Sequence, residues 1–346
     1  MAQTTTTKEL ATEQIVTEVL ATIDRERERE IVARRFGLFD RKETLEQIGE
    51  MLGITRERVR QLEKAVMTRL TASAEQGSVP HIKEFEAKTS ELLSETGGVS
   101  RVSNLTKKLG AEPTREEQAR VSFLSQLCPK MVVINDDDNF YNSVSIKSTF
   151  DDKKLKSTVT ELVATIKQLG EPKTIAQIAK AASIEDAKQA EALASTSKKL
   201  ATLNGRWGLI KWPMVNPKNI RDKIYVILKE NGKQMHFNEI SEAIKDSDFK
   251  RKDVTTQAIH NELIKDKRFV LIGRGIYALK EWGYEKGTVA DVIENVLQEA
   301  GEPLHRDEIV KRVLKSRFVK ETTILLNLQG KPQFKRVAKA TYALAE

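Results

Sequence analysis

The stretch TLEQIGEMLGITRERVRQLEKAVMTRL, residues 44–70, predicts two amphipathic helices separated by a short turn. Thr44 and Gln47 have the spacing of a capping box, so we expect the first helix to begin at Thr44. Its apolar face should comprise four residues at helical spacing, namely Leu45, Ile48, Met51 and Leu52. Gly53 is expected to end this helix and Thr55 to cap the next. A turn this short between two helices is typical of a helix-turn-helix.

The second of these helices should have one buried and one exposed side. Its apolar stripe comprises Val59, Leu62, Val66 and Leu70. At about 100° per residue, the opposite side carries polar residues, namely Glu57, Arg60, Gln61, Lys64 and Thr68, and Arg56 and Arg58 flank the first turn. In a recognition helix, Arg pairs with guanine, Gln with adenine, and Glu accepts from cytosine. A solvated surface helix would also carry such charges, but the capping box, the glycine turn and the clustered polar side together favour a DNA-reading helix.

The segment Arg25–Leu70 contains the motifs RERE, ARRFGL, TLEQIG and TRERVRQLE, and it closely resembles region 4 of the housekeeping (sigma-70 type) sigma factors of bacterial RNA polymerase. In that family the second helix enters the major groove of the −35 promoter element. The resemblance implies base contacts by Arg56, Glu57 and Gln61. It also implies contacts with the DNA backbone or groove edge by Thr55, Arg58, Arg60 and Lys64. Because region 4 also docks on the polymerase flap, double-stranded DNA and the RNA polymerase core are the expected partners.

The sequence departs from the sigma-factor pattern ahead of this segment. Sigma factors carry a separate helical region upstream that recognises and melts the −10 element. Only about 20 residues precede Asp24, too few for such a domain. The resemblance therefore implies duplex reading, polymerase docking or both, but not autonomous promoter opening.

Beyond about Gly77 the chain becomes periodic, with a repeat of about 60 residues. GKQMHFNEI, from Gly232, aligns with GEPLHRDEI, from Gly301, and GEPKTIAQI, from Gly170, keeps the pattern. The later segments FVLIGRGIYAL, FKRVAKATYAL and NGRWGLIKW align as well. Repetition of this length predicts an array of similar small domains.

Each repeat should form three helices followed by a β-hairpin, which is a winged helix. The clearest copy predicts these elements at Ile220–Glu230, Phe237–Ile244, Val254–Lys265 and Phe269–Leu279. A weaker copy runs from Phe85 to about Val144, with MVVINDDDNFYNSV as its hairpin. The expected fold class is therefore mainly α with small β-hairpin wings: an N-terminal helix-turn-helix bundle plus tandem winged-helix domains. The expected domains comprise residues 1–78, 79–150, 155–215, 218–285 and 287–346.

The segments RFVLIGRGIYALKEW and NGRWGLIKW resemble the HARE-type helix-turn-helix. This winged-helix family occurs in the delta subunit of bacterial RNA polymerase, in chromatin regulators and in fusions to restriction enzymes. The resemblance covers Asn219–Trp282 and Thr288–Ala345, and less completely Thr158–Trp212. It implies a role in transcription without assigning a partner to each surface. Delta-type members carry an acidic tail; this sequence has none, so polymerase recycling by such a tail is not expected.

The basic charge is concentrated near the end of the chain. The net charge is +8 and the pI about 9.3, a balance that favours attraction to nucleic acid or anionic membrane. From Leu304 onward, 10 basic residues stand against 4 acidic ones, a net of +6. The last repeat is therefore a candidate for DNA-backbone contact, through Lys331, Lys335, Arg336 and Lys339. The alternative is a solvated surface, which would carry evenly mixed charge.

Other residues that could suggest chemistry have simpler interpretations. His236 and His305 each precede a Glu by three residues, which predicts helix capping rather than metal binding. Asp136–Asp138 should form a polar turn, and Cys128 should be a small core residue. The aromatic residues at recurring hairpin positions should fill the core of each repeat rather than stack on bases: Trp207, Trp212, Tyr277, Trp282 and Tyr342. We therefore expect no enzyme activity, no cofactor and no metal.

The sequence also predicts where the protein acts. It contains neither a signal peptide nor an apolar run of the roughly 20 residues that a membrane span needs. Its single cysteine fits a reducing compartment, so a cytoplasmic location without membrane association is expected. The function expected first is a DNA-binding transcription regulator or polymerase-associated sigma-like factor that reads a −35-like promoter element. The alternative is a polymerase-docking interaction protein without sequence-specific DNA readout. A third possibility, an adaptor that presents DNA to a separate nuclease, rests only on fusions in the HARE family.

Overall fold

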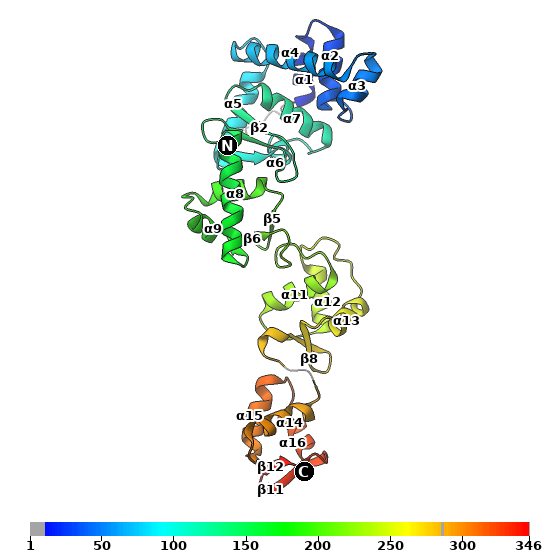
Figure 1. The fold of residues 1–346 in the computed structure, drawn as a ribbon, viewed down its shortest axis with the longest axis vertical. Coiled ribbons are helices and arrows are strands. Elements are labelled where there is room, and N and C mark those ends of the chain that lie inside the picture. Colours follow the sequence, from blue (N-terminus) through cyan, green and yellow to red (C-terminus); the bar gives the residue numbers. More distant parts are fainter. Residues whose placement is uncertain (1–10, 285–286, 346) are drawn as a thin grey trace, which may run out of the picture. The chain divides into compact units, whose positions relative to one another are not determined.

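The computed structural model describes residues 11–284 and 287–345. It is mainly helical, with small antiparallel sheets, which confirms the predicted fold class. The chain divides into two compact units, Met1–Ile210 and Lys211–Glu346, called here the N-terminal and C-terminal units. Figure 1 labels their elements. Within the described ranges, no helix is long and apolar enough to cross a membrane.

The N-terminal unit begins with four helices, among them the expected helix-turn-helix (Figure 1). They are α1 (Thr12–Ala21), α2 (Glu26–Phe36), α3 (Leu45–Leu52) and α4 (Arg56–Glu75). The capping box of Thr44 and Gln47 is present, Gly53 ends α3 with a φ of 64°, and Thr55 caps α4. The local signals in the sequence therefore set the bounds of α3 and the start of α4 as predicted.

Four winged units follow among the described residues, and each has the same element order. The first (residues 82–146) comprises α5 (Ile82–Glu95), β1 (Val99–Arg101), α6 (Val102–Lys108), α7 (Arg115–Leu127), β2 (Met131–Ile134) and β3 (Ser143–Ile146). The second (residues 152–209) comprises α8 (Asp152–Leu169), β4 (Lys173–Thr174), α9 (Ile175–Ala181), α10 (Ala187–Thr196), β5 (Leu200–Leu203) and β6 (Arg206–Leu209). Both belong to the N-terminal unit.

The C-terminal unit contains the other two. The third winged unit (residues 220–282) comprises α11 (Ile220–Asn231), β7 (Met235–His236), α12 (Phe237–Asp246), α13 (Thr256–Lys265), β8 (Phe269–Gly273), β9 (Ile276–Leu279) and the 3-10 turn η1 (Lys280–Trp282). The fourth (residues 289–344) comprises α14 (Val289–Ala300), β10 (Leu304–His305), α15 (Arg306–Ser316), α16 (Glu321–Gly330), β11 (Phe334–Ala338) and β12 (Thr341–Leu344).

All four units form a three-stranded antiparallel sheet in which the last strand lies in the middle. In the third unit Met235 of β7 pairs with Tyr277 of β9, and in the fourth Leu304 of β10 pairs with the equivalent Tyr342 of β12. The aligned segments of the third and fourth units thus occupy equivalent strands, and the first unit has the same strand order. The short first strand of each sheet was not expected, because a strand of two or three residues is too short to show an alternating pattern.

One hydrophobic core connects the helix-turn-helix to the first winged unit. It runs from Ile15 in α1, through Val66 and Leu70 in α4, to Phe123 in α7 and Val144 in β3. This core therefore contains residues from both sides of position 78, the predicted boundary between the first two domains. The fourth winged unit, by contrast, has a core of its own residues.

The structure supports the simpler interpretations of several polar and aromatic residues. His236 forms a capping box with Glu239, and His305 accepts from the backbone amide of Asp307. Asp137 accepts from the amides of Asn139 and Phe140 in a polar turn. The remaining residues of this group are buried, as core positions require: Cys128, Trp207, Tyr277 and Tyr342. Trp212 and Trp282 are half-buried.

One expectation about α3 was wrong. Met51 was predicted on the buried face, but its side chain is 43% exposed, whereas Ile48 is fully buried. The neighbouring Gly49 is buried instead, because the turn that follows α3 packs directly over it. Met51 therefore lies on the outer surface of the helix-turn-helix.

Candidate nucleic-acid interface

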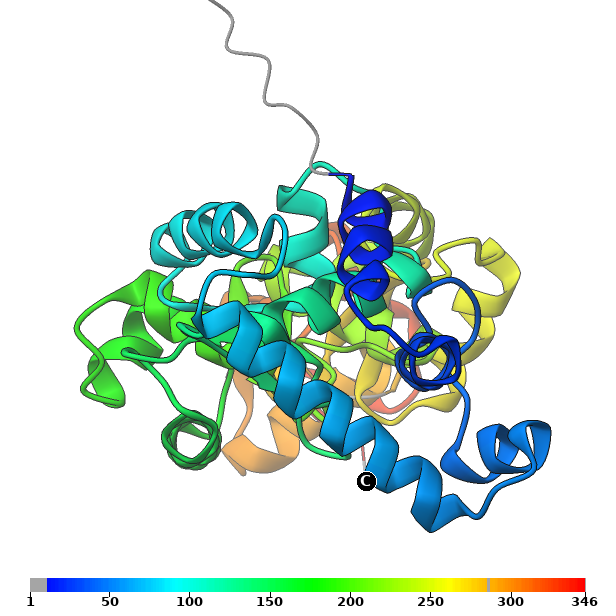
Figure 2. The same cartoon turned by 90° about the horizontal axis from the view of Figure 1, so that it is seen from above.

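The start of α4 presents an exposed polar surface at the edge of the N-terminal unit. Figure 2 shows α3 beside the N-terminal end of α4. All the residues predicted to contact DNA in this helix are exposed: Thr55, Arg56, Glu57, Arg58, Arg60, Gln61 and Lys64. Val59 and Val66, on the opposite side, are buried. The helix therefore has the orientation that a recognition helix needs.

Four of these side chains form a hydrogen-bonded network along the exposed face, which we call the α4 network: Glu57, Arg58, Arg60 and Gln61. The guanidinium of Arg60 donates to both carboxylate oxygens of Glu57, at 2.9 and 2.7 Å. The Gln61 amide donates to Glu57 at 3.3 Å, and Arg58 donates to the Gln61 oxygen at 3.4 Å. The network holds these side chains side by side in solvent.

Arg60 holds Glu57 in its ionised form. The hydrogen bond from Arg60, with smaller contributions from Gln61 and the charge of Arg56, lowers the pKa of Glu57 from 4.5 to about 2. The Glu57 carboxylate therefore only accepts hydrogen bonds at neutral pH. A cytosine amino group is a donor of the kind that it can bind.

Arg56 and Lys64 differ from the α4 network. Across the described ranges neither side chain makes an ion pair or a hydrogen bond to another side chain, and both are exposed. The hydroxyl of Thr55 already caps α4, since it accepts a hydrogen bond from the backbone amide of Arg58 at 3.2 Å. Arg56 is thus the predicted base contact that can reach DNA without breaking an existing interaction.

Ion pairs behind the helix hold it against α2. Arg35 of α2 lies 3.3 Å from Glu63 of α4, and Arg69 of α4 pairs with the buried Glu28 of α2. Arg27 donates to the carbonyl oxygen of Leu52, the last residue of α3, at 2.6 Å. These contacts fix both helices of the helix-turn-helix on α2, so that the exposed end of α4 is rigidly supported.

Gly49 has a role that the apolar pattern of α3 does not reveal. It lies inside α3, and a Cβ atom there would lie 2.7 Å from the carbonyl oxygen of Ile54, closer than a real Cβ approaches. The amide of Ile54 donates to the carbonyl of Gly49 at 2.9 Å, which closes the turn between the two helices. A glycine inside a helical pattern is the signal that could have indicated this close approach.

Comparison with known proteins agrees with this geometry. Residues 25–72 match the family model for Sigma-70, region 4. A stretch of 45 residues is 49% identical to RNA polymerase sigma factor sigB of Arabidopsis thaliana. Residues 25–72 form a Sigma-70 region 4 domain. Such a domain is a DNA-binding helix-turn-helix that reads the −35 element.

The comparisons cover a small part of the chain. The matched stretch covers 13% of this chain and 8% of the length of the Arabidopsis protein. It therefore supports a sigma-like role in DNA binding and association with RNA polymerase for the region 4 domain.

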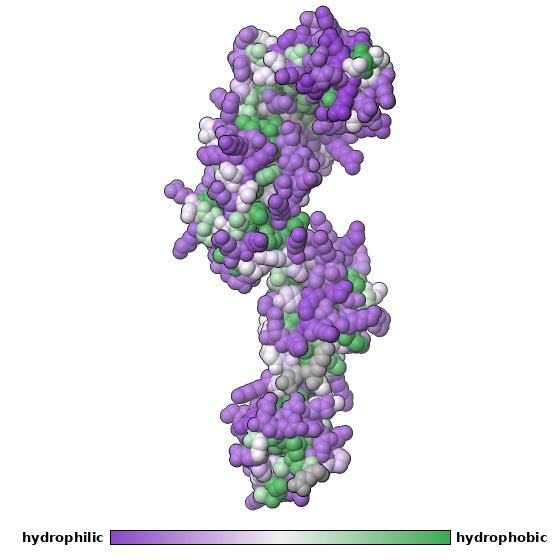
Figure 3. Space-filling view, in the orientation of Figure 1, coloured by the Kyte–Doolittle hydropathy of each residue, from purple (hydrophilic) through white to green (hydrophobic). Residues whose placement is uncertain are grey.

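A second basic surface lies on the wing of the fourth winged unit. Lys335 and Arg336 are exposed on β11, the edge strand of its sheet, and Lys339 is exposed in the following turn. Lys331 is exposed just before the strand. The hydrophilic residues of this unit are visible in Figure 3. Charged side chains on an edge strand also protect it from pairing with other strands, so the position alone does not require a ligand.

The third helices of the last three winged units carry little basic charge, and in α7 of the first unit two Arg are balanced by two Glu. In many winged helices this element enters the major groove, as in other helix-turn-helix proteins. Here α16 contains no Lys or Arg, and α10 and α13 contain one Lys each, balanced by one Glu. A wing contact with the DNA backbone therefore fits the fourth unit better than base reading by its third helix.

Proposed function

We propose that this protein is a non-enzymatic DNA-binding transcription regulator, or a polymerase-associated sigma-like factor, that reads a −35-like promoter element. The observation that carries the proposal is the exposed start of α4 in a Sigma-70 region 4 domain. Arg56, Glu57 and Gln61 read bases from this surface. Thr55, Arg58, Arg60 and Lys64 contact the backbone or groove edge.

The DNA contacts differ in what each side chain must give up within the protein. Arg56 can bind without losing a side-chain interaction among the described residues. Glu57 and Gln61 then exchange hydrogen bonds within the α4 network for hydrogen bonds to base edges. Breaking exposed hydrogen bonds costs little free energy, since water competes for them already. Arg60, released from Glu57, is long enough to reach a phosphate.

The winged units supply further contacts under this proposal. We assign them to the HARE type on the resemblance of their hairpin segments, and their common topology supports the assignment. The fourth unit contacts the DNA backbone through Lys331, Lys335, Arg336 and Lys339. Such contacts add affinity that falls steeply with salt and does not depend on sequence.

A selection experiment with the full chain tests the proposal. Randomised duplexes are bound at two salt concentrations, and the retained DNA is sequenced. An enriched motif that disappears in Arg56→Ala and Gln61→Ala variants supports base reading, and a −35-like motif ties the protein to promoters. Binding without any enriched motif would refute sequence-specific readout. The full chain is needed, because the core of the region 4 domain continues into the first winged unit.

A second function is favoured by two exposed apolar side chains of the region 4 domain. Phe39 is 46% exposed and Met51 43% exposed, and neither belongs to the polar face of α4 that is proposed to read bases. Under this alternative the domain docks on RNA polymerase and reads no sequence. The full chain would then bind the polymerase core, lose that binding on Phe39→Ser or Met51→Ser substitution, and enrich no motif in the selection.

A further inference from the structure

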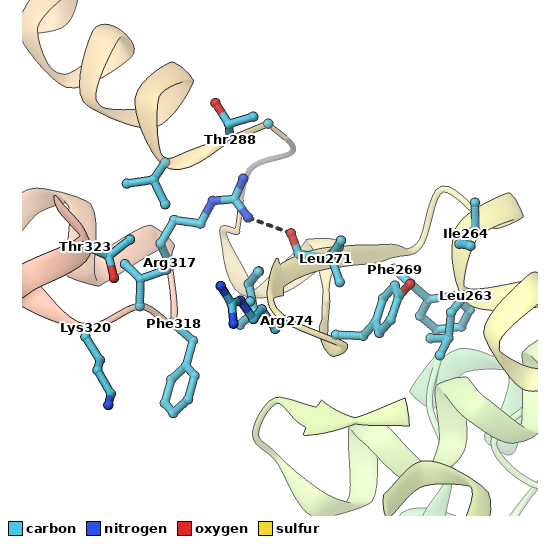
Figure 4. A pocket seen from close by; sticks show the side chains of 16 residues that line it. Leu263, Ile264, Phe269, Leu271, Arg274, Thr288, Arg317, Phe318, Lys320 and Thr323 are labelled. Atoms are coloured by element: carbon cyan, nitrogen blue, oxygen red, sulfur yellow. Dashed lines mark hydrogen bonds between the residues drawn. The ribbon is translucent and has the colours of Figure 1, made fainter. Parts of the chain in front are cut away.

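A cleft of about 810 Å³ lies within the C-terminal unit, between the hairpin of the third winged unit and the loop before α16 of the fourth. Its walls include Leu271 and Arg274 on one side and Phe318 and Lys320 on the other. Figure 4 shows these side chains. The two walls come close together, since a Cβ atom on Gly273 would lie 3.0 Å from the carbonyl oxygen of Phe318.

Arg317 joins the two walls at the base of the cleft. Its Nη1 donates to the carbonyl oxygen of Leu271 at 2.6 Å, as the dashed line in Figure 4 marks. The residue is only 6% exposed, and its Nε and Nη2 make no hydrogen bond to the described part of the protein. An arginine side chain keeps its positive charge when buried. The base of the cleft is therefore electropositive.

The charge around the cleft is of one sign. Of the described lining residues, Arg274, Arg317 and Lys320 are basic and none is acidic. Asp291 acts on Arg317 through its charge, but its carboxylate accepts a hydrogen bond from the backbone of Thr288 and does not line the cleft. Arg274 and Lys320 are exposed, so they are accessible to an incoming carboxylate.

The cleft is also bordered by large apolar side chains in solvent. Leu271 is 47% exposed, Phe318 52% and Ile264 60%. Grouped apolar side chains beside fixed charges mark binding surfaces more often than isolated ones do. A DNA phosphate would use the charges but would gain nothing from these apolar contacts. A peptide segment that carries both acidic and apolar side chains would use both.

We propose that this cleft is a docking site for an acidic, apolar segment of a partner protein. Carboxylates of the segment bind Arg274 and Lys320 at the rim, above the buried charge of Arg317. Its apolar side chains pack on Leu271, Phe318 and Ile264. The inference is independent of DNA reading by α4, which belongs to the other unit.

The test uses the full chain and a labelled synthetic peptide in which Glu alternates with Leu and Phe. Binding is followed by fluorescence anisotropy, and hydrogen exchange locates the site. We expect protection of residues 269–275 and 317–323, and no binding of the same peptide with Gln in place of Glu. Arg274→Gln combined with Lys320→Gln, or Phe318→Ser alone, should weaken binding about tenfold.

Matched substitutions outside the cleft serve as controls. Lys311→Gln removes an exposed charge of the same unit, and Leu314→Ser changes an apolar side chain that is 44% exposed on the same helix. Both should leave peptide binding unchanged. The proposal is overturned if the peptide does not bind, if the control variants lose binding equally, or if a random duplex rather than the peptide protects residues 317–323.

Discussion

Arg120 of α7 donates a hydrogen bond of 2.8 Å from its Nε to the carbonyl oxygen of Leu38. This bond joins the first winged unit to the loop after α2 in the region 4 domain. The same guanidinium lies 3.0 Å from Glu13 of α1 and 2.5 Å from Glu117 of its own helix, and Arg120 is buried. The region 4 domain is therefore joined to the first winged unit by a polar contact as well as by a shared hydrophobic core.

Replacement of Arg120 by Ala should destabilise the N-terminal unit by about 2–4 kcal/mol. The reason is that the Leu38 carbonyl oxygen loses its donor and Glu117, which is largely buried, loses its ion-pair partner; the exposed Glu13 contributes less. Urea unfolding of the full chain, followed by hydrogen exchange in α1 and α7, measures the change. Arg115→Ala, at an exposed position of the same helix, is the control and should change stability by less than about 0.5 kcal/mol. Equal stability of the two variants would show that the Arg120 contacts contribute nothing.

Much of this architecture could be predicted from the sequence, because the relevant signals are local. Thr44 and Gln47 specify the start of α3, and Thr55 specifies the start of α4. The third winged unit was predicted nearly element by element, since each helix or hairpin lies between identifiable caps and turns. In the region 4 domain, 3.6-residue periodicity was enough to place the exposed face of α4.

The remaining features depend on contacts between distant residues. The bond from Arg120 to Leu38 spans 82 positions and has no local signature. The core that residues on both sides of position 78 share could likewise not be predicted from the sequence, because periodicity identifies an apolar face but not the element that packs on it. The exposure of Met51 and the close packing at Gly49 were also not revealed by the apolar pattern alone. The domain boundaries at 78 and 150 stay predictions.

Arg56→Ala should weaken binding to the preferred duplex by about 1–3 kcal/mol and relax discrimination at one base pair. Arg56 is exposed at the first turn of α4, where side chains reach base edges. Anisotropy titrations on the preferred site and on single-base variants of it measure both effects. An equal loss on every duplex would mean that Arg56 binds phosphate instead. Arg115→Ala again provides the matched control.

The pKa of Glu57 provides a prediction about pH. Its carboxylate should stay largely ionised between its ordinary pKa of 4.5 and about 2, and should protonate only as the pH falls through about 2. Its ion pair with Arg60 is therefore fully present above pH 4.5 and is lost as the pH falls through about 2. Carboxyl-detected NMR titration of the Arg60→Gln variant should show protonation shifted upward, toward 4.5. An unchanged titration would show that Arg60 does not hold Glu57. Because the pair is exposed, salt should reduce the difference.

The basic wing of the fourth winged unit should contribute affinity without specificity. Substitution of its four basic residues by Gln should weaken binding uniformly across sequences. It should also reduce the slope of log K against log salt by about 0.9 for each DNA phosphate that the protein no longer neutralises. Titrations at several salt concentrations on specific and random duplexes provide both values. The four residues are Lys331, Lys335, Arg336 and Lys339.

A control of equal charge separates local contact from net charge. Four exposed lysines of the third winged unit can be replaced by Gln together: Lys233, Lys245, Lys250 and Lys267. This variant loses the same total charge, so it should lower affinity slightly through the long-range field but leave most of the salt slope intact. If both fourfold variants reduce the slope of log K against log salt equally, the wing of the fourth unit does not contact DNA directly.

Gly49→Ala should impair both stability and DNA binding of the region 4 domain. In an ordinary helix interior this substitution stabilises by about 0.5–1 kcal/mol. Here the added Cβ would lie 2.7 Å from the carbonyl oxygen of Ile54, so the turn that leads into α4 must move. We expect a net loss of about 1–3 kcal/mol in unfolding free energy and weaker binding to the preferred duplex. Gly330→Ala, at the end of α16 with no atom within 4 Å of the new Cβ, should be neutral or stabilising. If Gly49→Ala behaves like Gly330→Ala, then α3 and its turn have room to separate, and the rigid placement of α4 inferred above is wrong.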